Sequence, residues 1–223
     1  MSLTKSELAS YMDHTLLKAD ATAERIDAVI AEARELGCAS VCVNGAWVPR
    51  VAAGLADSAV ATCAVIGFPL GAGSTAAKVA EAADVVAAGA AEVDMVINMG
   101  WLKSGDEAAV RDDIAAVADA CHAGGAILKV IIECCLLTDA EKVRACELSR
   151  EVGADFVKTS TGFSTGGATP ADVALMRATV GPEMGVKAAG GIRTLADALA
   201  MIDAGANRLG VSAAPAILAE LDA

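Results

Sequence analysis

Val152-Gly-Ala-Asp-Phe-Val157 is one copy of a short unit that recurs along the chain. In each copy a helical pattern ends at a glycine, and an apolar run follows. Glycine can adopt the left-handed conformation that ends a helix, and the run after it is typical of a buried parallel strand. The other copies are Leu36-Gly-Cys-Ala-Ser-Val41, Ala88-Gly-Ala-Ala-Glu-Val93 and Ala204-Gly-Ala-Asn-Arg-Leu209, with Ala123-Gly-Gly-Ala-Ile-Leu128 as a looser one. The repeat therefore predicts a chain built from alternating helices and strands.

Extending these copies outward predicts eight strands and the helices between them. The strands are expected near Tyr11–Thr15, Ser40–Asn44, Ala59–Ile66, Glu92–Asn98, Ile127–Ile132, Asp155–Lys158, Gly185–Ala188 and Asn207–Val211. Alanine-rich amphipathic segments are expected at Ala21–Leu36, Ser74–Ala88, Asp106–His122 and Thr138–Val152. Helix-capping residues are expected at Asp20, Ser74, Thr138, Thr169 and Thr194. Eight such units predict an α/β fold, a single (β/α)8 TIM barrel, with a doubly wound open sheet as the alternative.

Length, composition and charge indicate how many domains to expect and which classes of partner are unsuitable. The 223 residues contain no linker-like segment, so we expect one domain spanning residues 1–223. A net charge of -12 leaves no basic face for nucleic acid or an anionic membrane. The first residues lack an apolar leader, and no apolar run reaches the roughly 18 residues of a membrane span. We therefore expect a cytoplasmic protein without nucleic-acid or membrane partners.

Cysteine and histidine usage argues against a metal centre. The seven cysteines form an odd set without C-x-x-C spacing, and the histidines are His14 and His122. This pattern indicates neither a disulfide framework nor a zinc site, so we predict no metal and no cofactor. We interpret the cysteines as reduced, buried apolar side chains.

Two lysines stand where lysine is unusual. Lys158 and Lys187 each lie at the end of an apolar run that is predicted to be a buried strand. A buried ammonium group requires a partner or loses its proton. Because side chains alternate along a strand, Lys158, Lys187, Lys129 and Asp94 are all expected to point into the barrel. The alternative is a paired ionic plug, but lysines on neighbouring strands would repel one another in a purely structural plug.

The pair of lysines has a chemical rationale. An amine attacks a carbonyl group only when it is neutral, and a nearby cation or burial lowers its pKa. The resulting Schiff base withdraws electrons, so that a carbon–carbon bond one position away can break or form. Asp94 can then relay the proton of the hydroxyl group that becomes an aldehyde.

Glycine-rich turns follow the last three predicted strands. They contain Gly162, the Gly190-Gly191 pair, and Gly210 with Ser212. Backbone amides in such turns can bind an anion, and this edge of a (β/α)8 barrel often binds phosphate. The sequence therefore predicts a small phosphorylated carbonyl compound as substrate.

Several longer motifs carry a family resemblance. They are Asp13-His-Thr-Leu-Leu-Lys18, Val41-Cys-Val-Asn44, Ile66-Gly-Phe-Pro-Leu-Gly71, Glu92-Val-Asp-Met-Val-Ile-Asn98, Leu128-Lys-Val-Ile-Ile-Glu133, Lys158-Thr-Ser-Thr-Gly162 and Lys187-Ala-Ala-Gly-Gly-Ile-Arg-Thr194. Together they resemble the deoxyribose-phosphate aldolases over nearly the whole chain. The resemblance implies a class I aldolase, a lyase that reversibly cleaves 2-deoxy-D-ribose 5-phosphate to acetaldehyde and D-glyceraldehyde 3-phosphate without a metal.

The resemblance also implies roles for individual residues. Lys158 matches the lysine that forms the Schiff base, Lys187 the second lysine, and Asp94 the aspartate of the proton relay. The sugar is expected to contact Asp13, Thr15, Asn44, Lys129 and Thr161. The phosphate is expected to contact Gly162, Gly190, Gly191, Gly210 and Ser212. Ala213 replaces a serine found in many relatives, which predicts weaker phosphate binding, and the family allows a homodimer.

Two other functions remain open at this point. One is another Schiff-base barrel aldolase of the transaldolase type, which would use a ketose or pyruvate donor. The other is a non-catalytic barrel that binds sugar phosphates. Product analysis separates the first from a deoxyribose-phosphate aldolase, and borohydride trapping with substrate separates the second.

Overall fold

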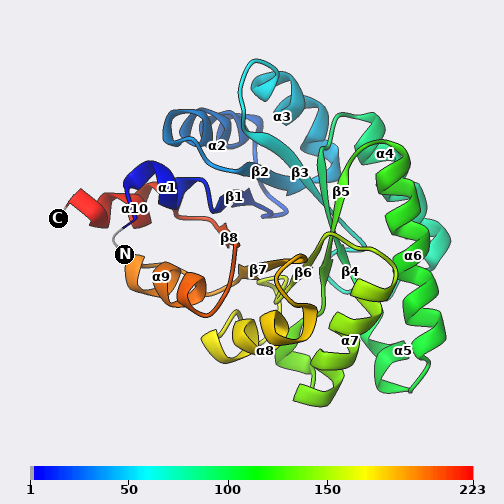
Figure 1. Cartoon of the computed structure of the whole chain (residues 1–223). Coiled ribbons are helices and arrows are strands. Elements are labelled where there is room, and N and C mark those ends of the chain that lie inside the picture. Colours follow the sequence, from blue (N-terminus) through cyan, green and yellow to red (C-terminus); the bar gives the residue numbers. More distant parts are fainter. Residues whose placement is uncertain (1–2, 223) are drawn as a thin grey trace.

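The computed structural model describes residues 3–222, which form a closed parallel barrel surrounded by helices (Figure 1). The strands follow one another around the barrel in sequence order, and β8 pairs with β1. This closure confirms the (β/α)8 barrel and excludes the open sheet. The strands are β1 (Met12–Leu16), β2 (Ser40–Asn44), β3 (Ala61–Ile66), β4 (Glu92–Val96), β5 (Ile127–Ile131), β6 (Phe156–Lys158), β7 (Gly185–Ala189) and β8 (Arg208–Val211).

Helices connect successive strands and cover the outside of the barrel. They are α1 (Lys5–Ala9), α2 (Ala23–Leu36), α3 (Val48–Leu55), α4 (Thr75–Ala87), α5 (Met99–Lys103), α6 (Glu107–Ala123), α7 (Asp139–Glu151), α8 (Pro170–Val180), α9 (Leu195–Asp203) and α10 (Ala214–Ala219). Short 3-10 turns lie at Gly45–Trp47, Cys134–Leu136 and Glu220–Asp222. In the predicted repeat, Gly37 ends α2 in the left-handed conformation, with a φ of 72°.

Most of the predicted helix caps are confirmed. Ser74, Thr138, Thr169 and Thr194 each accept a hydrogen bond from a backbone amide in the first turn of their helix. The prediction for Asp20 was wrong, because Thr22 caps α2 by accepting the Arg25 amide. Two polar residues stand close together before this helix, and only the backbone conformation decides which one lies at the cap position.

The strands present two different faces. Val93 and Met95 of β4 are fully buried against the helices, as expected for the layer outside the barrel. Asp94, which lies between them, points inward, and the register aligns Asp94 with Lys129 and Lys158 with Lys187 on neighbouring strands. Tight parallel pairing therefore brings ionisable side chains that are far apart in sequence into one small volume.

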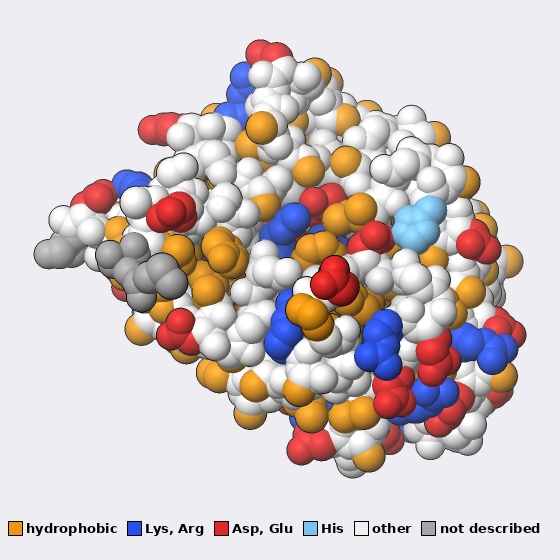
Figure 2. Space-filling view, in the orientation of Figure 1, with side chains coloured by type: hydrophobic (Ala, Val, Ile, Leu, Met, Phe, Trp, Pro, Cys, Tyr) orange, Lys and Arg blue, Asp and Glu red, His pale blue; other side chains and the backbone are white. Residues whose placement is uncertain are grey.

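The surface carries mixed charge on the side visible in Figure 2. Acidic and basic side chains are interspersed over α6 and α7, where Arg144 pairs with Glu107, Glu147 and Glu151 at 2.8, 3.1 and 2.9 Å. Such exposed pairs contribute little to stability individually. Within residues 3–222, no helix combines the length and the apolar character needed to cross a membrane.

Candidate active site

Among the described residues, seven acidic or basic side chains meet inside the barrel. The basic ones are Lys129, Lys158, Lys187 and Arg208, and the acidic ones are Asp13, Glu92 and Asp94. All come from strands, because alternate residues of β1 and β4–β8 point toward the barrel axis. Four basic groups therefore face three carboxylates, and the formal charges balance when one of the four basic groups is neutral.

Asp94 is the centre of the part of this cluster that contains the three lysines. Its Oδ2 atom lies 2.7 Å from the Nζ atom of Lys158 and 2.7 Å from that of Lys187. Its Oδ1 atom lies 2.8 Å from Lys129 Nζ. Because strand register sets these positions, a single carboxylate holds three amines within hydrogen-bond distance. The sequence prediction that these four side chains gather inside the barrel is confirmed.

The pKa values of the buried groups follow from this crowding. Burial alone would raise the pKa of Asp94, but Lys129, Lys158 and Lys187 outweigh burial and hold it well below its usual value. Burial alone would lower the pKa of Lys187, but Asp13 and Asp94 raise it above its usual value. Asp13 and Asp94 thus favour the charged form of Lys187, which lies beside Lys158.

A second set of ion pairs lies on the side of these residues that faces away from the cavity. Arg208 contacts Asp13 Oδ1 at 2.6 Å and Glu92 Oε2 at 2.9 Å, and Lys129 reaches Glu92 Oε2 at 2.6 Å. These pairs form the ionic plug considered as an alternative from the sequence. The barrel thus contains both an ionic plug of paired charges and a lysine, Lys158, that lines the cavity described next.

The cavity at the carboxyl ends of the strands has a volume of about 680 Å³, which suits a small molecule. Lys158 lines it, whereas Lys129 and Lys187 lie behind the wall. Other basic side chains along the cavity are Lys18, Arg25 and Arg193, and Glu32 is the acidic one. In a protein with a net charge of -12, this local excess of basic groups favours an anionic ligand.

The glycine-rich turns converge on this cavity. Gly162, Gly190, Gly191, Gly210 and Ser212 all line it. Gly190 has a φ of 83°, and a Cβ atom there would lie 3.1 Å from Gly167 Cα and 3.4 Å from Gly162 Cα. This close approach of two turns leaves no room for a side chain at Gly190, so this part of the cavity wall consists of peptide groups.

The residues predicted to contact the sugar occupy different positions. Thr15 and Thr161 line the cavity. Asp13 and Lys129 are fully buried in the ionic layers and are absent from its wall. Asn44 also lies outside the wall, and its side-chain amide donates to the Leu17 carbonyl group at 3.3 Å. The structure therefore brings two of these five predicted residues to the cavity.

Several residues in the cavity, next to it or in the ionic layer beneath it received no role from the sequence. Arg193 and Lys18 line the cavity and lie within quoted motifs, and the available signal for Arg193 was its basic character two residues after the predicted phosphate residue Gly191. Arg208 is two residues before Gly210 on β8, so strand alternation would have placed it inside the barrel. Phe163 and Phe68 stack edge to face with their ring centres 5.2 Å apart, a long-range contact that the sequence does not reveal.

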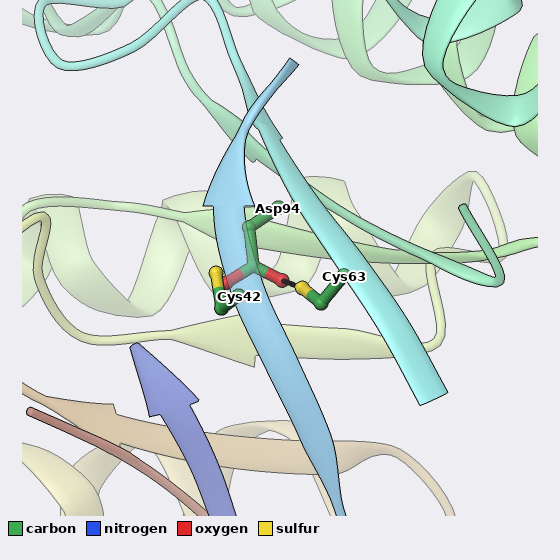
Figure 3. A group of neighbouring side chains, drawn as sticks. All are labelled: Cys42, Cys63 and Asp94. Carbon is green, nitrogen blue, oxygen red and sulfur yellow. Dashed lines mark hydrogen bonds between the residues drawn. The ribbon is translucent and has the colours of Figure 1, made fainter. Parts of the chain in front are cut away.

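Cys42 and Cys63 point toward Asp94 from neighbouring strands (Figure 3). The Cys63 thiol donates to Asp94 Oδ1 at 3.3 Å. The three side chains have a spacing compatible with a metal ion. Three lysines also contact Asp94, however, and their charges oppose binding of a cation. We therefore interpret both thiols as packing groups beside the amine cluster.

A closed (β/α)8 barrel with a lysine at its cavity and a shared aspartate behind it defines a class of barrel enzymes that act on carbonyl compounds. The family model for DeoC/LacD family aldolases matches residues 8–219. This chain belongs to that family, as the sequence resemblance indicated.

Relatives agree with this assignment. Proteins named deoxyribose-phosphate aldolase from Streptococcus pneumoniae (serotype 19F, strain G54) and Streptococcus suis (strain 98HAH33) are 59% and 58% identical to this chain. Each match covers 95% of this chain and 96% of the relative. The tetrameric structure of deoxyribose phosphate aldolase from Aeropyrum pernix has a TM-score of 0.92 and 35% identity, covering 99% of this chain and 93% of that one.

Proposed function

We propose that this protein reversibly cleaves 2-deoxy-D-ribose 5-phosphate to acetaldehyde and D-glyceraldehyde 3-phosphate through a Schiff base on Lys158. The observation that carries the proposal is the position of Lys158. It lines the cavity, and its Nζ atom shares Asp94 Oδ2 with the buried Lys187. The names of the relatives in Streptococcus and Aeropyrum supply the substrate.

In the proposed reaction the neutral Lys158 amine attacks C1 of the open-chain sugar, and loss of water gives the protonated Schiff base. Removal of the proton from the C3 hydroxyl group lets the C2–C3 bond break. Its electron pair moves toward the iminium, which leaves an enamine and releases D-glyceraldehyde 3-phosphate. Protonation of the enamine at C2 and hydrolysis then release acetaldehyde and restore the amine.

Lys187 and Asp94 have separate roles in this proposal. Lys187 supplies a fixed positive charge next to Lys158, which favours the neutral amine over a second ammonium group. Asp94 passes the hydroxyl proton onward, directly or through a water molecule. Its pKa is held below the usual range, with burial outweighed by Lys129, Lys158 and Lys187, so it holds a proton only in passing.

The phosphate is proposed to bind at the glycine-rich turns. Gly162, Gly190, Gly191, Gly210 and Ser212 line one part of the cavity together with Arg193. Backbone amides and one guanidinium group suit a phosphate dianion. Ala213 offers no hydroxyl group, so we expect Ser212 to provide the side-chain hydrogen bond.

The direct test is borohydride reduction in the presence of acetaldehyde, followed by peptide mass spectrometry. The expected product is an N-ethyl group on Lys158, formed from the imine by hydride addition. Lys103→Met, which removes a half-exposed lysine on α5, should leave the adduct unchanged. Absence of an adduct in folded protein would favour a binding protein. A ketose or pyruvate adduct, without acetaldehyde release from deoxyribose 5-phosphate, would favour a transaldolase-type enzyme.

We also propose a cytoplasmic location and a homodimer. The free cysteines, six of which are buried, suit a reducing compartment. The solution mass measured by light scattering tests the homodimer, with the tetramer named for the Aeropyrum pernix structure as the contrary outcome.

A further inference from the structure

Glu133 has an unusual backbone conformation and contacts Thr161, which lines the cavity. It follows β5, its side chain is 1% exposed, and its φ is 56°. Within residues 3–222 it is the non-glycine residue with a positive φ. A glutamate in this conformation is strained, and such strain persists only where neighbouring contacts hold the residue in place.

The closest side-chain contacts of Glu133 are with one residue, and the Cys135 thiol adds a longer contact to its Oε1 atom at 3.9 Å. Its carboxylate accepts the Thr161 amide at 3.2 and 3.3 Å and the Thr161 hydroxyl group at 2.5 Å. In the described part of the chain, no lysine or arginine lies within salt-bridge distance of it. A buried carboxylate whose closest hydrogen bonds come from the amide and the hydroxyl group of one residue fixes that residue strongly.

This contact also determines what Thr161 can do. A hydroxyl group has one proton, and that of Thr161 is donated to Glu133 while its oxygen accepts the Phe163 amide at 3.0 Å. Thr161 therefore has no proton to offer the sugar. Its hydroxyl group instead shapes the turn that contains Gly162, which has a φ of 81°.

Gly162 belongs to the glycine surface of the cavity. A Cβ atom on Gly190 would lie 3.4 Å from Gly162 Cα, so the turns after β6 and β7 touch at this point. A shift of the Thr161–Phe163 turn would therefore displace the backbone amides of both turns. Anion binding by amides depends on their direction, so such a shift weakens binding without touching Lys158.

We propose that Glu133 is a positioning residue for phosphate recognition, acting through Thr161 on the turn after β6. This inference deepens the proposed function and rests on it for the identity of the substrate. Glu133 contacts neither the amine cluster nor, in this proposal, the substrate. An acceptor-only carboxylate suits the site because both groups of Thr161 that point at it are donors.

The test compares phosphorylated and unphosphorylated sugar. Glu133→Gly removes the carboxylate and also relieves the positive φ, so the fold is not penalised by backbone strain. The ratio of kcat/KM for 2-deoxyribose 5-phosphate to that for 2-deoxyribose should fall roughly 10- to 100-fold. Activity on 2-deoxyribose and the acetaldehyde adduct on Lys158 should stay near the wild-type level. Binding of inorganic phosphate, followed by calorimetry, should weaken by a similar factor.

Three variants control the result. Glu133→Gln keeps the shape and one acceptor, so it should retain more of the ratio than Glu133→Gly. Adding Thr161→Val to Glu133→Gly should lower the ratio little further, because both act on one contact. Glu141 accepts the Thr138 amide at 2.7 Å and its hydroxyl group at 3.0 Å, the same arrangement at the start of α7. Glu141→Ala should therefore leave the ratio unchanged.

Two outcomes would overturn the role of Glu133. One is an unchanged ratio with unchanged phosphate binding in folded Glu133→Gly. The other is an equal fall for both sugars, which would place its effect on the amine chemistry. Failure of the wild-type protein to release acetaldehyde from either sugar would contradict the proposed function itself, and phosphate binding would still decide the role of Glu133.

Discussion

Two buried lysines in this barrel have opposite characters. Lys78 of α4 and Asp113 of α6 are each 1% exposed and lie 2.6 Å apart, and Thr75 donates to the second oxygen of Asp113 at 2.7 Å. Lys158 is equally well hidden at 3% exposure, yet its partner Asp94 is shared with Lys129 and Lys187. Lys158 also lines the cavity, whereas Lys78 does not.

The difference lies in charge balance and access. Lys78 and Asp113 form one closed pair between two helices, in which every charge has its own partner. Lys158 competes with two other lysines for one carboxylate and faces open space. A buried ion pair by itself therefore does not indicate a reactive site, whereas a buried amine with a shared counter-ion beside a cavity does.

Removal of the Lys158 amine should have the largest effect. Lys158→Ala is expected to lower turnover by roughly 10⁴-fold or more, because among residues 3–222 no other lysine that lines the cavity contacts Asp94. The borohydride adduct with acetaldehyde should disappear, while the circular dichroism spectrum stays that of the wild type. Retained turnover in this variant would overturn the proposed mechanism.

Removal of the neighbouring charge should have the next largest effect. Lys187→Leu leaves Lys158 and Asp94 in place but deletes the fixed cation that disfavours a second ammonium group. We expect kcat to fall by roughly 10²- to 10³-fold, a typical loss for a preorganised electrostatic group. Steady-state kinetics with deoxyribose 5-phosphate measures this, and a change in KM alone would contradict it.

Substitutions in the Lys78–Asp113 pair should change the stability of the protein and leave its activity unchanged. Asp113→Ala leaves Lys78 buried without its partner, which should cost about 3–5 kcal/mol in the free energy of unfolding. Replacing both residues, with Lys78→Met and Asp113→Leu, should recover most of this loss. Urea unfolding measures both, and kcat of the folded double variant should match the wild type. A large loss of kcat there would mean that the comparison between the two lysines is wrong.

The smallest effect is expected from pH. Burial alone would raise the pKa of Asp94, yet Lys129, Lys158 and Lys187 hold it below its usual value, so its stabilising contribution is complete above the unfolded pKa of about 4. This contribution is lost as pH falls further toward the folded-state pKa. The Tm should therefore be level from about pH 5 to 8 and fall below about pH 4. Asp94→Asn should show a shallower fall, and an equally steep one would assign the acid transition to other carboxyl groups.

The alternation of side chains along the strands was the sequence pattern that predicted most about the site. It placed Asp94, Lys129, Lys158 and Lys187 inside the barrel, and the structure confirms that they meet there. It did not predict their depth along the barrel axis: Lys129 and Asp13, which the family resemblance assigned to the sugar pocket, also contact Glu92 and Arg208 in the deeper ionic layer. Depth along the barrel axis depends on the stagger between strands, which no local pattern encodes.

Lys78 illustrates a different limit. Its position in an alanine-rich amphipathic helix gives no sign of burial, because the burial depends on the distance and angle between α4 and α6. The same holds for Glu133, whose partner Thr161 is 28 positions away and whose left-handed backbone is not a preference of glutamate.

The sequence alone determined the order of helices and strands, the barrel and the faces of the strands, because these follow from short-range periodicity and from glycine at helix ends. It also determined the family, through motifs that contain the interior lysines. Only the tertiary structure decided which lysine reaches the cavity, which carboxylates form the plug and which turn Glu133 holds. These depend on barrel stagger and on contacts between distant segments, where positions within a few ångströms separate an amine that lines a cavity from one in a closed ion pair.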